Sequence, residues 1–137
     1  MDVRNAAVSL VGRAGLAAIF IWSGVGKIVS PEATQAAIPS LGILLPVQVY
    51  WLTVLVELAG GLALLAGVAS RISAAALAAF SLATAFAFHG DLADQGQIVH
   101  LMKNVSIAGG LLLLVANGPG ALSFGQPKPR GPREAGT

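Results

Sequence analysis

Long apolar stretches alternate with short polar stretches rich in glycine and proline along this sequence. A helix needs about 20 mostly apolar residues to cross the hydrocarbon core of a bilayer. The stretches long enough to do so lie at about residues 6–29, 45–69, 72–88 and 98–117. The pattern therefore predicts an all-α membrane protein, a bundle of four transmembrane helices that forms one domain over residues 1–125.

Helix-breaking residues separate the predicted helices. The loop between the first and second helices is bracketed by Pro31, Pro39 and Pro46. A tight turn is expected at residues 67–71, a polar loop at residues 89–97, and a helix end at Gly118-Pro119-Gly120. Residues 126–137 are polar and rich in proline and glycine, so we expect them to form a disordered tail.

The composition points to lipid as the main solvent. The chain is 55% hydrophobic and only 10% charged, whereas a soluble domain carries about 25% charged residues. There is no cysteine, which excludes disulfides, iron–sulfur clusters and thiolate zinc sites. Any redox chemistry would therefore need a bound small molecule or a partner protein. No basic stripe alternates with aromatic residues, so a nucleic-acid partner is not expected.

The distribution of lysine and arginine predicts the orientation. With the N-terminus in the cytoplasm, the outer side holds only Lys27 and Lys103. The cytoplasmic side then holds Arg4, Arg13, Arg71, Lys128, Arg130 and Arg133. The positive-inside rule thus places both termini in the cytoplasm, for a protein integral to the cell (inner) membrane. Because Arg13 interrupts the first apolar stretch, we do not expect a cleavable signal peptide.

An internal similarity links the second and fourth predicted helices. Residues 58–65 and 107–114 both carry a glycine pair followed by a leucine-rich run. One interpretation is a two-plus-two parallel repeat, because both helices would run in the same direction. The other is that glycine, alanine and leucine are common in any membrane helix. In either case, small residues allow helix backbones to approach closely.

Glu57 lies near the centre of the second predicted helix. A charged residue at the bilayer centre costs about 2.5–3.5 kcal/mol on insertion scales, so it is expected to face the bundle interior and to have a partner. Thr53 shares its helix face, which supports an inward orientation. Arg13 is the best partner by depth, and such a pair would lower the insertion cost of both groups. Lys27 and Lys103 are alternative partners.

A second set of polar residues is expected at the outer ends of the helices. The lysines there can instead extend to the headgroups, and the histidines can instead be capping or interfacial residues. No tight ligand spacing demands a metal, so none is expected. The candidate ligand-binding residues are Glu57, Lys103, His89, Arg13, Lys27, Asn104 and His100.

Three aromatic residues lie towards the predicted outer ends of their helices: Trp22, Tyr50 and Trp51. Tryptophan and tyrosine are enriched at membrane–water interfaces, so the first expectation is that all three anchor the helices there. The alternative is that they line a pocket for a flat lipophilic ring.

Several blocks, taken in order, resemble the DoxX family of small membrane proteins. They are Arg13, residues 19–27 (IFIWSGVGK), 57–61 (ELAGG), 86–89 (FAFH) and 103–110 (KNVSIAGG), and Leu122-Ser123. The resemblance covers about residues 10–125 and implies a four-helix membrane domain. It also implies a relationship to the small subunit of thiosulfate:quinone oxidoreductase, and an association with oxidative stress, quinone resistance and partner redox enzymes.

These observations give one leading functional hypothesis and two alternatives. The first is a redox-associated subunit that binds a quinone or similar lipophilic molecule, with Glu57, Lys103 and His89 at its oxygens and Arg13 setting the charge of Glu57. The second is a non-catalytic scaffold or anchor for a partner redox enzyme, and the third is a small transporter. No self-contained catalytic motif is present, so activity would belong to a membrane oxidoreductase complex. The expected partners are lipid, a membrane or peripheral redox protein, and a second copy of the chain.

Overall fold

The computed structural model describes residues 3–124, and this part of the chain is built from helices without any strand. The helices are α1 (Val3–Val29), α2 (Glu32–Ser40), α3 (Pro46–Ala66), α4 (Ser70–Phe88) and α5 (Gln95–Asn117). All except α2 are long and apolar enough to cross a membrane. The prediction of an all-α membrane bundle is confirmed. The predicted tail at residues 126–137 lies outside the described residues.

The helix ends follow local backbone chemistry. α3 begins with Pro46, which needs no hydrogen-bond acceptor in the first turn. It ends at Gly67, whose φ of 79° is left-handed and suits glycine, so the helix is shorter than predicted. α5 begins before the predicted start because the carboxylate of Asp94 accepts hydrogen bonds from the backbone N–H groups of Gly96 and Gln97.

The short helix α2 was not predicted, and the expectation of a plain loop between the first two spans was wrong. Pro31 caps its N-terminus, and Pro39 lies in its last turn, so prolines that suggested a loop mark the ends of a helix. Ile38 of α2 is buried and packs with Tyr50 and Val54 of α3. α2 has nine residues, which are too few to span a bilayer. A search for apolar stretches of about 20 residues therefore does not detect it.

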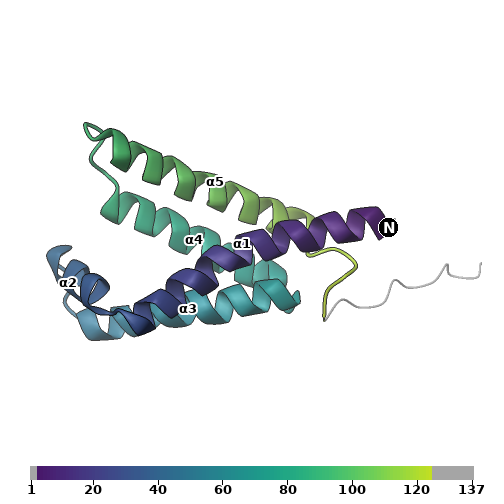
Figure 1. Cartoon of the computed structure of the whole chain (residues 1–137), viewed down its shortest axis with the longest axis horizontal. Coiled ribbons are helices and arrows are strands. Elements are labelled where there is room, and N and C mark those ends of the chain that lie inside the picture. Colours follow the sequence, from purple (N-terminus) through teal and green to yellow (C-terminus); the bar gives the residue numbers. More distant parts are fainter. Residues whose placement is uncertain (1–2, 125–137) are drawn as a thin grey trace, which may run out of the picture.

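The spanning helices form two antiparallel pairs, α1 with α3 and α4 with α5. The pairs are joined by contacts between α3 and α4, whereas α1 and α5 hardly touch. Figure 1 shows the pairs close together near the N-terminus and diverging towards the end that holds α2 and the α4–α5 loop. The core where they meet includes Ala17, Leu64, Leu77 and Leu111, all of which are fully buried.

The paired glycines of the internal similarity have different surroundings. A Cβ atom on Gly61 would lie 2.9 Å from Cγ1 of Ile21 and 3.4 Å from the carbonyl oxygen of Ala17, so α3 and α1 are packed backbone to backbone there. In α5, a Cβ on Gly110 would lie 3.4 Å from Leu16, and one on Gly109 would meet open space. The helix pairing suits a two-plus-two repeat, but the repeat itself stays a prediction.

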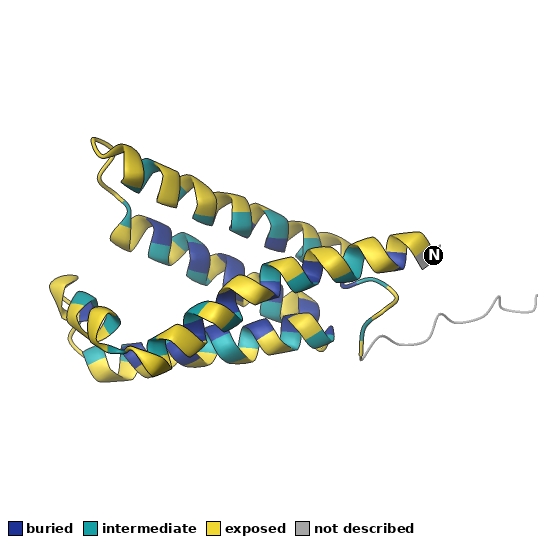
Figure 2. Ribbon diagram, viewed as in Figure 1, coloured by how far each residue is buried: buried dark blue, intermediate teal, exposed yellow. Residues whose placement is uncertain are grey.

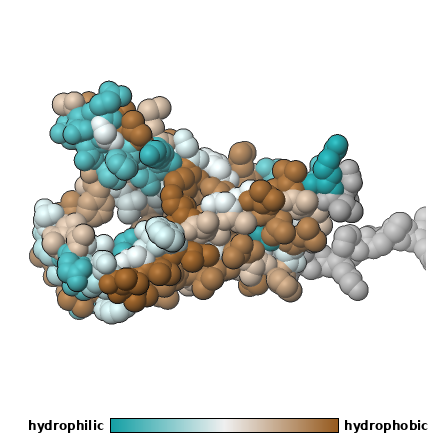
Figure 3. Space-filling view, in the orientation of Figure 1, coloured by the Kyte–Doolittle hydropathy of each residue, from teal (hydrophilic) through white to brown (hydrophobic). Residues whose placement is uncertain are grey.

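The outer surface of the bundle is apolar. Figure 2 shows that buried positions lie on the inward faces of the helices, while the outward faces are exposed. The exposed side chains include Val8, Trp22, Leu44, Leu55 and Leu113. In Figure 3, hydrophobic residues cover most of the visible side, hydrophilic residues gather at the end with the α4–α5 loop, and the surface is hollowed below that loop. Outward apolar faces are what contact with lipid requires.

Candidate functional site

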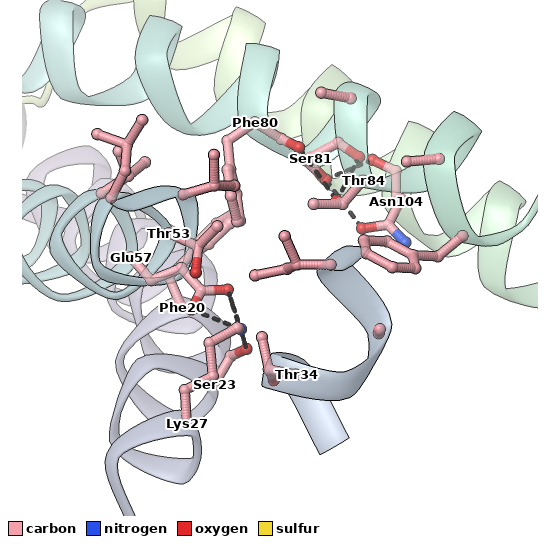
Figure 4. A pocket seen from close by; sticks show the side chains of 18 of the residues that line it. Phe20, Ser23, Lys27, Thr34, Thr53, Glu57, Phe80, Ser81, Thr84 and Asn104 are labelled. Carbon is pink, nitrogen blue, oxygen red and sulfur yellow. Dashed lines mark hydrogen bonds and ion pairs between the residues drawn. The ribbon is translucent and has the colours of Figure 1, made fainter. Parts of the chain in front are cut away.

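A buried ion pair joins α1 and α3. Nζ of Lys27 lies 2.7 Å from Oε2 and 2.8 Å from Oε1 of Glu57, and it also donates to Oγ of Ser23 at 2.8 Å. The hydroxyl of Ser23 donates to Oε1 of Glu57 at 2.9 Å. The Glu57 side chain is only 4% exposed. Figure 4 shows the two charged side chains pointing towards each other. Of the three basic residues considered as partners, Lys27 forms the pair.

Arg13 has a different role from the one expected, and the prediction that it partners Glu57 was wrong. Its guanidinium donates hydrogen bonds of 2.6 Å to the carbonyl oxygens of Pro119 and Leu122. Arg13 and Lys27 are 14 residues apart, which separates them by about 21 Å along α1. Since Lys27 is level with Glu57, Arg13 lies towards the opposite end of the bundle and does not set the charge of that carboxylate.

Residues 118–124, here called the C-terminal strap, cross the end of the bundle near the N-terminus. Besides the Arg13 contacts, the hydroxyl of Ser9 donates to the carbonyl oxygen of Pro119 at 3.0 Å. The N–H of Phe124 donates to the carbonyl oxygen of Ala66 at 3.0 Å. Ser123 packs so closely on Gly67 that a side chain at that position would collide with it. The strap is therefore fastened to α1 and to the α3–α4 turn.

A cavity of about 780 Å³ lies between the helix pairs where they diverge. Small-molecule sites have volumes of about 300–1,000 Å³, with mostly apolar walls and a few polar groups. The cavity fits this description, because hydrophobic side chains form most of its wall. Its polar lining residues are Ser23, Lys27, Thr34, Thr53, Glu57, Ser81, Thr84, His89 and Asn104.

The polar groups face the cavity from two sides, as Figure 4 shows. The α1–α3 wall carries the ion pair with Ser23 and Thr53. The α4–α5 wall carries Ser81, Thr84, His89 and Asn104. On that wall, the hydroxyl of Ser81 donates to Oδ1 of Asn104 at 3.1 Å, and the hydroxyl of Thr84 donates to the carbonyl oxygen of Phe80 at 3.0 Å.

Sequence reasoning missed Ser81 and Thr84 because the candidate residues were chosen around charged and histidine side chains, and the third predicted helix contains no charged residue. The available signal was their spacing: residues three apart share a helix face, and few other hydroxyls occur on that helix.

Helix α2 contributes a third side of the cavity through residues such as Thr34, Ala37 and Ile38. Its position is fixed by Tyr50, which packs on Ile38 and donates its hydroxyl to the carbonyl oxygen of Lys27 at 2.6 Å. The expectation that Tyr50 anchors the chain at the membrane interface was therefore wrong, since the residue is buried. Trp22 and Trp51 are exposed, as interfacial anchors would be.

His89 lies at the edge of the cavity and is held by neighbours. Its Nδ1 is 2.6 Å from Oε1 of Gln97, and its ring stacks on that of His100 with centroids 4.9 Å apart. His100 is exposed and does not line the cavity. Within residues 3–124, no group of three or more histidine, aspartate or glutamate side chains is placed to hold a metal ion.

A second hollow of about 470 Å³ runs along the seam where α1 and α5 hardly touch. This α1–α5 groove is lined by Ile19, Val99, Met102, Lys103, Ser106 and Ile107. Ile19 and Ile107 also line the cavity, so the groove adjoins the cavity. Lys103, expected beside the other polar residues, faces this groove instead.

The structure thus brings together four of the seven predicted site residues on one cavity: Lys27, Glu57, His89 and Asn104. His100 stacks on the ring of His89 but does not itself line the cavity, and Lys103 lies in the adjoining groove. Arg13 is at the far end of the bundle, beside the strap. That these residues bind a ligand stays a prediction.

Comparison with known proteins gives consistent results. The family model described as DoxX matches residues 8–90. The chain is 41% identical over 115 residues to the inner membrane protein YqjF of Escherichia coli (strain K12), covering 84% of this chain and 87% of that protein. It is 32% identical over 121 residues to the inner membrane protein YphA of the same organism, covering 84% and 86%. No solved structure matches the chain. The extent of these matches establishes that the chain belongs to the DoxX family.

Proposed function

We propose that this DoxX-family chain is an integral inner-membrane protein that binds a quinone, or a similar lipophilic ring with polar oxygens, as a redox-associated subunit. The observation that carries the proposal is the cavity of about 780 Å³ with the Lys27–Glu57 pair in its wall. The location is supported by the apolar spans and by the names of YqjF and YphA, both inner membrane proteins.

The chemistry of the walls supports a ring with oxygens at opposite ends. Phe20, Phe80 and Ile107 provide apolar surface for the ring itself. Polar groups on the α1–α3 wall and on the α4–α5 wall face the same space from opposite sides (Figure 4). A molecule that is apolar in the middle and polar at both ends would satisfy both walls at once.

Glu57 and His89 give the cavity groups that can exchange protons. Reduction of a quinone to a hydroquinone adds two electrons and two protons, so a binding site benefits from an acid and a base beside the ring. The chain contains no cysteine, so the two electrons would come from a partner redox protein, which would be oxidised in the same step.

The test compares two substitutions one turn apart on α4. Ala83 lines the cavity, whereas Ala79 is exposed and lies outside it. Ala83→Phe should fill part of the cavity, and Ala79→Phe should add the same side chain on the lipid side. Binding of decylubiquinone to purified protein in lipid nanodiscs should weaken by about tenfold or more in Ala83→Phe and stay at the wild-type value in Ala79→Phe.

Thermal unfolding of both unliganded variants provides the control for folding. If wild-type protein binds neither decylubiquinone nor its reduced form, decylubiquinol, or if both variants bind as the wild type does, the cavity is not a quinone site. The role as an anchor for a partner redox enzyme would then be the better explanation, and a co-purifying partner should be found without any ligand.

A further inference from the structure

The hydrogen bonds within the α1–α3 wall leave no donor free. An ammonium group has three hydrogens, and Nζ of Lys27 has three acceptors: Oγ of Ser23 and both carboxylate oxygens of Glu57. The hydrogen of Ser23 is also used, on Oε1 of Glu57. Oε2 of Glu57 accepts only from Lys27, so it can accept one more hydrogen bond.

The hydroxyl groups of Thr53, Ser81 and Thr84 have also committed their hydrogens. Thr53 donates to the carbonyl oxygen of Tyr50 at 2.7 Å. Thr84 donates to backbone carbonyl oxygens of its own helix, and Ser81 donates to Asn104. A hydroxyl has one hydrogen but two lone pairs. Each of these oxygens can therefore still accept a hydrogen bond from a ligand but cannot donate one without breaking a bond it already makes.

Few donors remain to balance these acceptors. The amide of Asn104 uses one hydrogen on the carbonyl oxygen of His100 and keeps the other. Thr34 forms no side-chain hydrogen bond with any described residue, so its hydroxyl can donate. Acceptors thus outnumber donors on the cavity wall.

We infer that the cavity selects the hydroxyl-bearing, reduced form of its ligand, a hydroquinone, over the corresponding quinone. The inference rests on the proposed function and specifies its ligand. A hydroquinone donates two O–H groups, which suit Oε2 of Glu57 and the threonine oxygens. A quinone has no O–H group, so even with its carbonyl oxygens on Thr34 and Asn104 it would leave Oε2 of Glu57 and the threonine oxygens desolvated without partners, which is costly in a low-dielectric site.

Tighter binding of the reduced form makes the bound couple easier to reduce. A tenfold preference corresponds to a rise of about 30 mV in the reduction potential of a two-electron couple. Oxidation of the bound hydroquinone to the quinone would lower its affinity for the cavity and favour its release.

The experiment measures three ligands with the same ring under anaerobic conditions, using wild-type protein in nanodiscs. They are decylubiquinol, decylubiquinone and the dimethyl ether of decylubiquinol, which keeps the ring and its oxygens but has no O–H hydrogen. Decylubiquinol should bind about tenfold more tightly than the other two. Equal affinities would overturn the inference and leave the proposed function standing. Absence of binding by all three would overturn both.

A pair of variants ties the preference to particular atoms. Thr53→Val with Thr84→Val removes two acceptor oxygens with little change in shape, so it should reduce the advantage of decylubiquinol by about threefold or more. Ser73→Ala, which removes a hydroxyl of α4 outside the cavity lining, should leave the advantage unchanged. An unchanged preference in the double threonine variant contradicts the assignment of these oxygens. Glu57→Gln should move the preference towards the quinone, because it replaces an acceptor with a donor.

Discussion

Lys27 and Glu57 place opposite charges inside a bundle whose outer faces are apolar, and Ser23 completes their hydrogen bonds. Taking two charges out of water is costly, and the attraction between them offsets this cost only when the geometry is good and the remaining polar atoms are satisfied. Here the ammonium is fully satisfied by protein atoms, while the carboxylate, which lines the cavity, can accept one more hydrogen bond. Of the two charged residues, Glu57 is therefore the one that can form a further hydrogen bond, as an acceptor.

Removing one partner of this pair should be more harmful than removing both. Lys27→Met leaves the Glu57 carboxylate buried without a counter-charge and should lower the free energy of unfolding by about 3 kcal/mol. Adding Glu57→Met should restore most of the loss. The free energies are measured by denaturant titration in mixed micelles. Lys103→Met is the matched control, because Lys103 is exposed and forms no ion pair with any residue from 3 to 124, and it should change little. A double variant as unstable as Lys27→Met would contradict this reading.

The sequence was sufficient to predict that Glu57 is buried and paired, because the cost of an isolated charge in a bilayer requires it. The identity of the partner was not predictable, since three basic residues were available and the choice depends on depth. Arg13 was the wrong choice because its acceptors are backbone carbonyls of the strap, more than 100 positions away along the chain. Backbone carbonyls carry no residue-specific signal in a sequence.

At the scale of elements, the four spanning helices were predictable because hydrophobic length alone identifies them. Their ends differ from prediction by a few residues, where capping by Asp94 and Gly67 decides them. The short helix α2 and the C-terminal strap were not predictable by the same means. Both are held by tertiary contacts, α2 through Ile38 and Tyr50 and the strap through Arg13.

The attachment of the strap to Arg13 can be tested with a chemical reporter, because the chain contains no cysteine of its own. Ser123→Cys introduces a thiol where the strap packs on Gly67. Adding Arg13→Met removes both guanidinium hydrogen bonds, so labelling at this position by a water-soluble maleimide should become about tenfold faster. Phe124→Cys, at an exposed position, should label at a rate that Arg13→Met does not change. Equal labelling rates at position 123 with and without Arg13 would show that other contacts hold the strap.

The α1–α5 groove suggests how a tailed ligand reaches the cavity. Ser106 lines the groove, whereas Val105 lies at the same depth on α5 and lines neither hollow. We expect Ser106→Trp to weaken binding of decylubiquinone by about tenfold, because the decyl tail would lie in the groove. The affinity for the same quinone ring without the decyl tail should not change. Val105→Trp should affect neither ligand. Equal weakening of both ligands by Ser106→Trp would mean that the substitution distorts the cavity itself.

At the scale of the whole molecule, two helix pairs meet at one end and diverge at the other (Figure 1). Neither the pairing of α1 with α3, which are separated by α2, nor the divergence of the two pairs was predictable from the apolar stretches, since both depend on tertiary contacts such as the loose one between α1 and α5. The cavity is a result of this divergence. A pattern of apolar stretches does not reveal whether a bundle is tightly filled or open.

The positive-inside rule makes a prediction about the orientation of the bundle in the membrane, and this prediction can be tested in intact cells. Asn5→Cys and Asp91→Cys place thiols at exposed positions at opposite ends of the bundle. The positive-inside rule predicts that a membrane-impermeant maleimide labels position 91 in intact cells and position 5 only after permeabilisation. The reverse labelling pattern would require the opposite orientation.

The C-terminal strap has a consequence for what the protein can do to a membrane. The packed core around Leu64, Leu77 and Leu111 and then the strap lie between the cavity and the end that holds the N-terminus. The cavity therefore does not continue to that end, and a ligand bound in it would enter and leave at one leaflet. A protein of this shape can hold and exchange a molecule without opening a leak, so it would leave the ion gradient across the membrane intact.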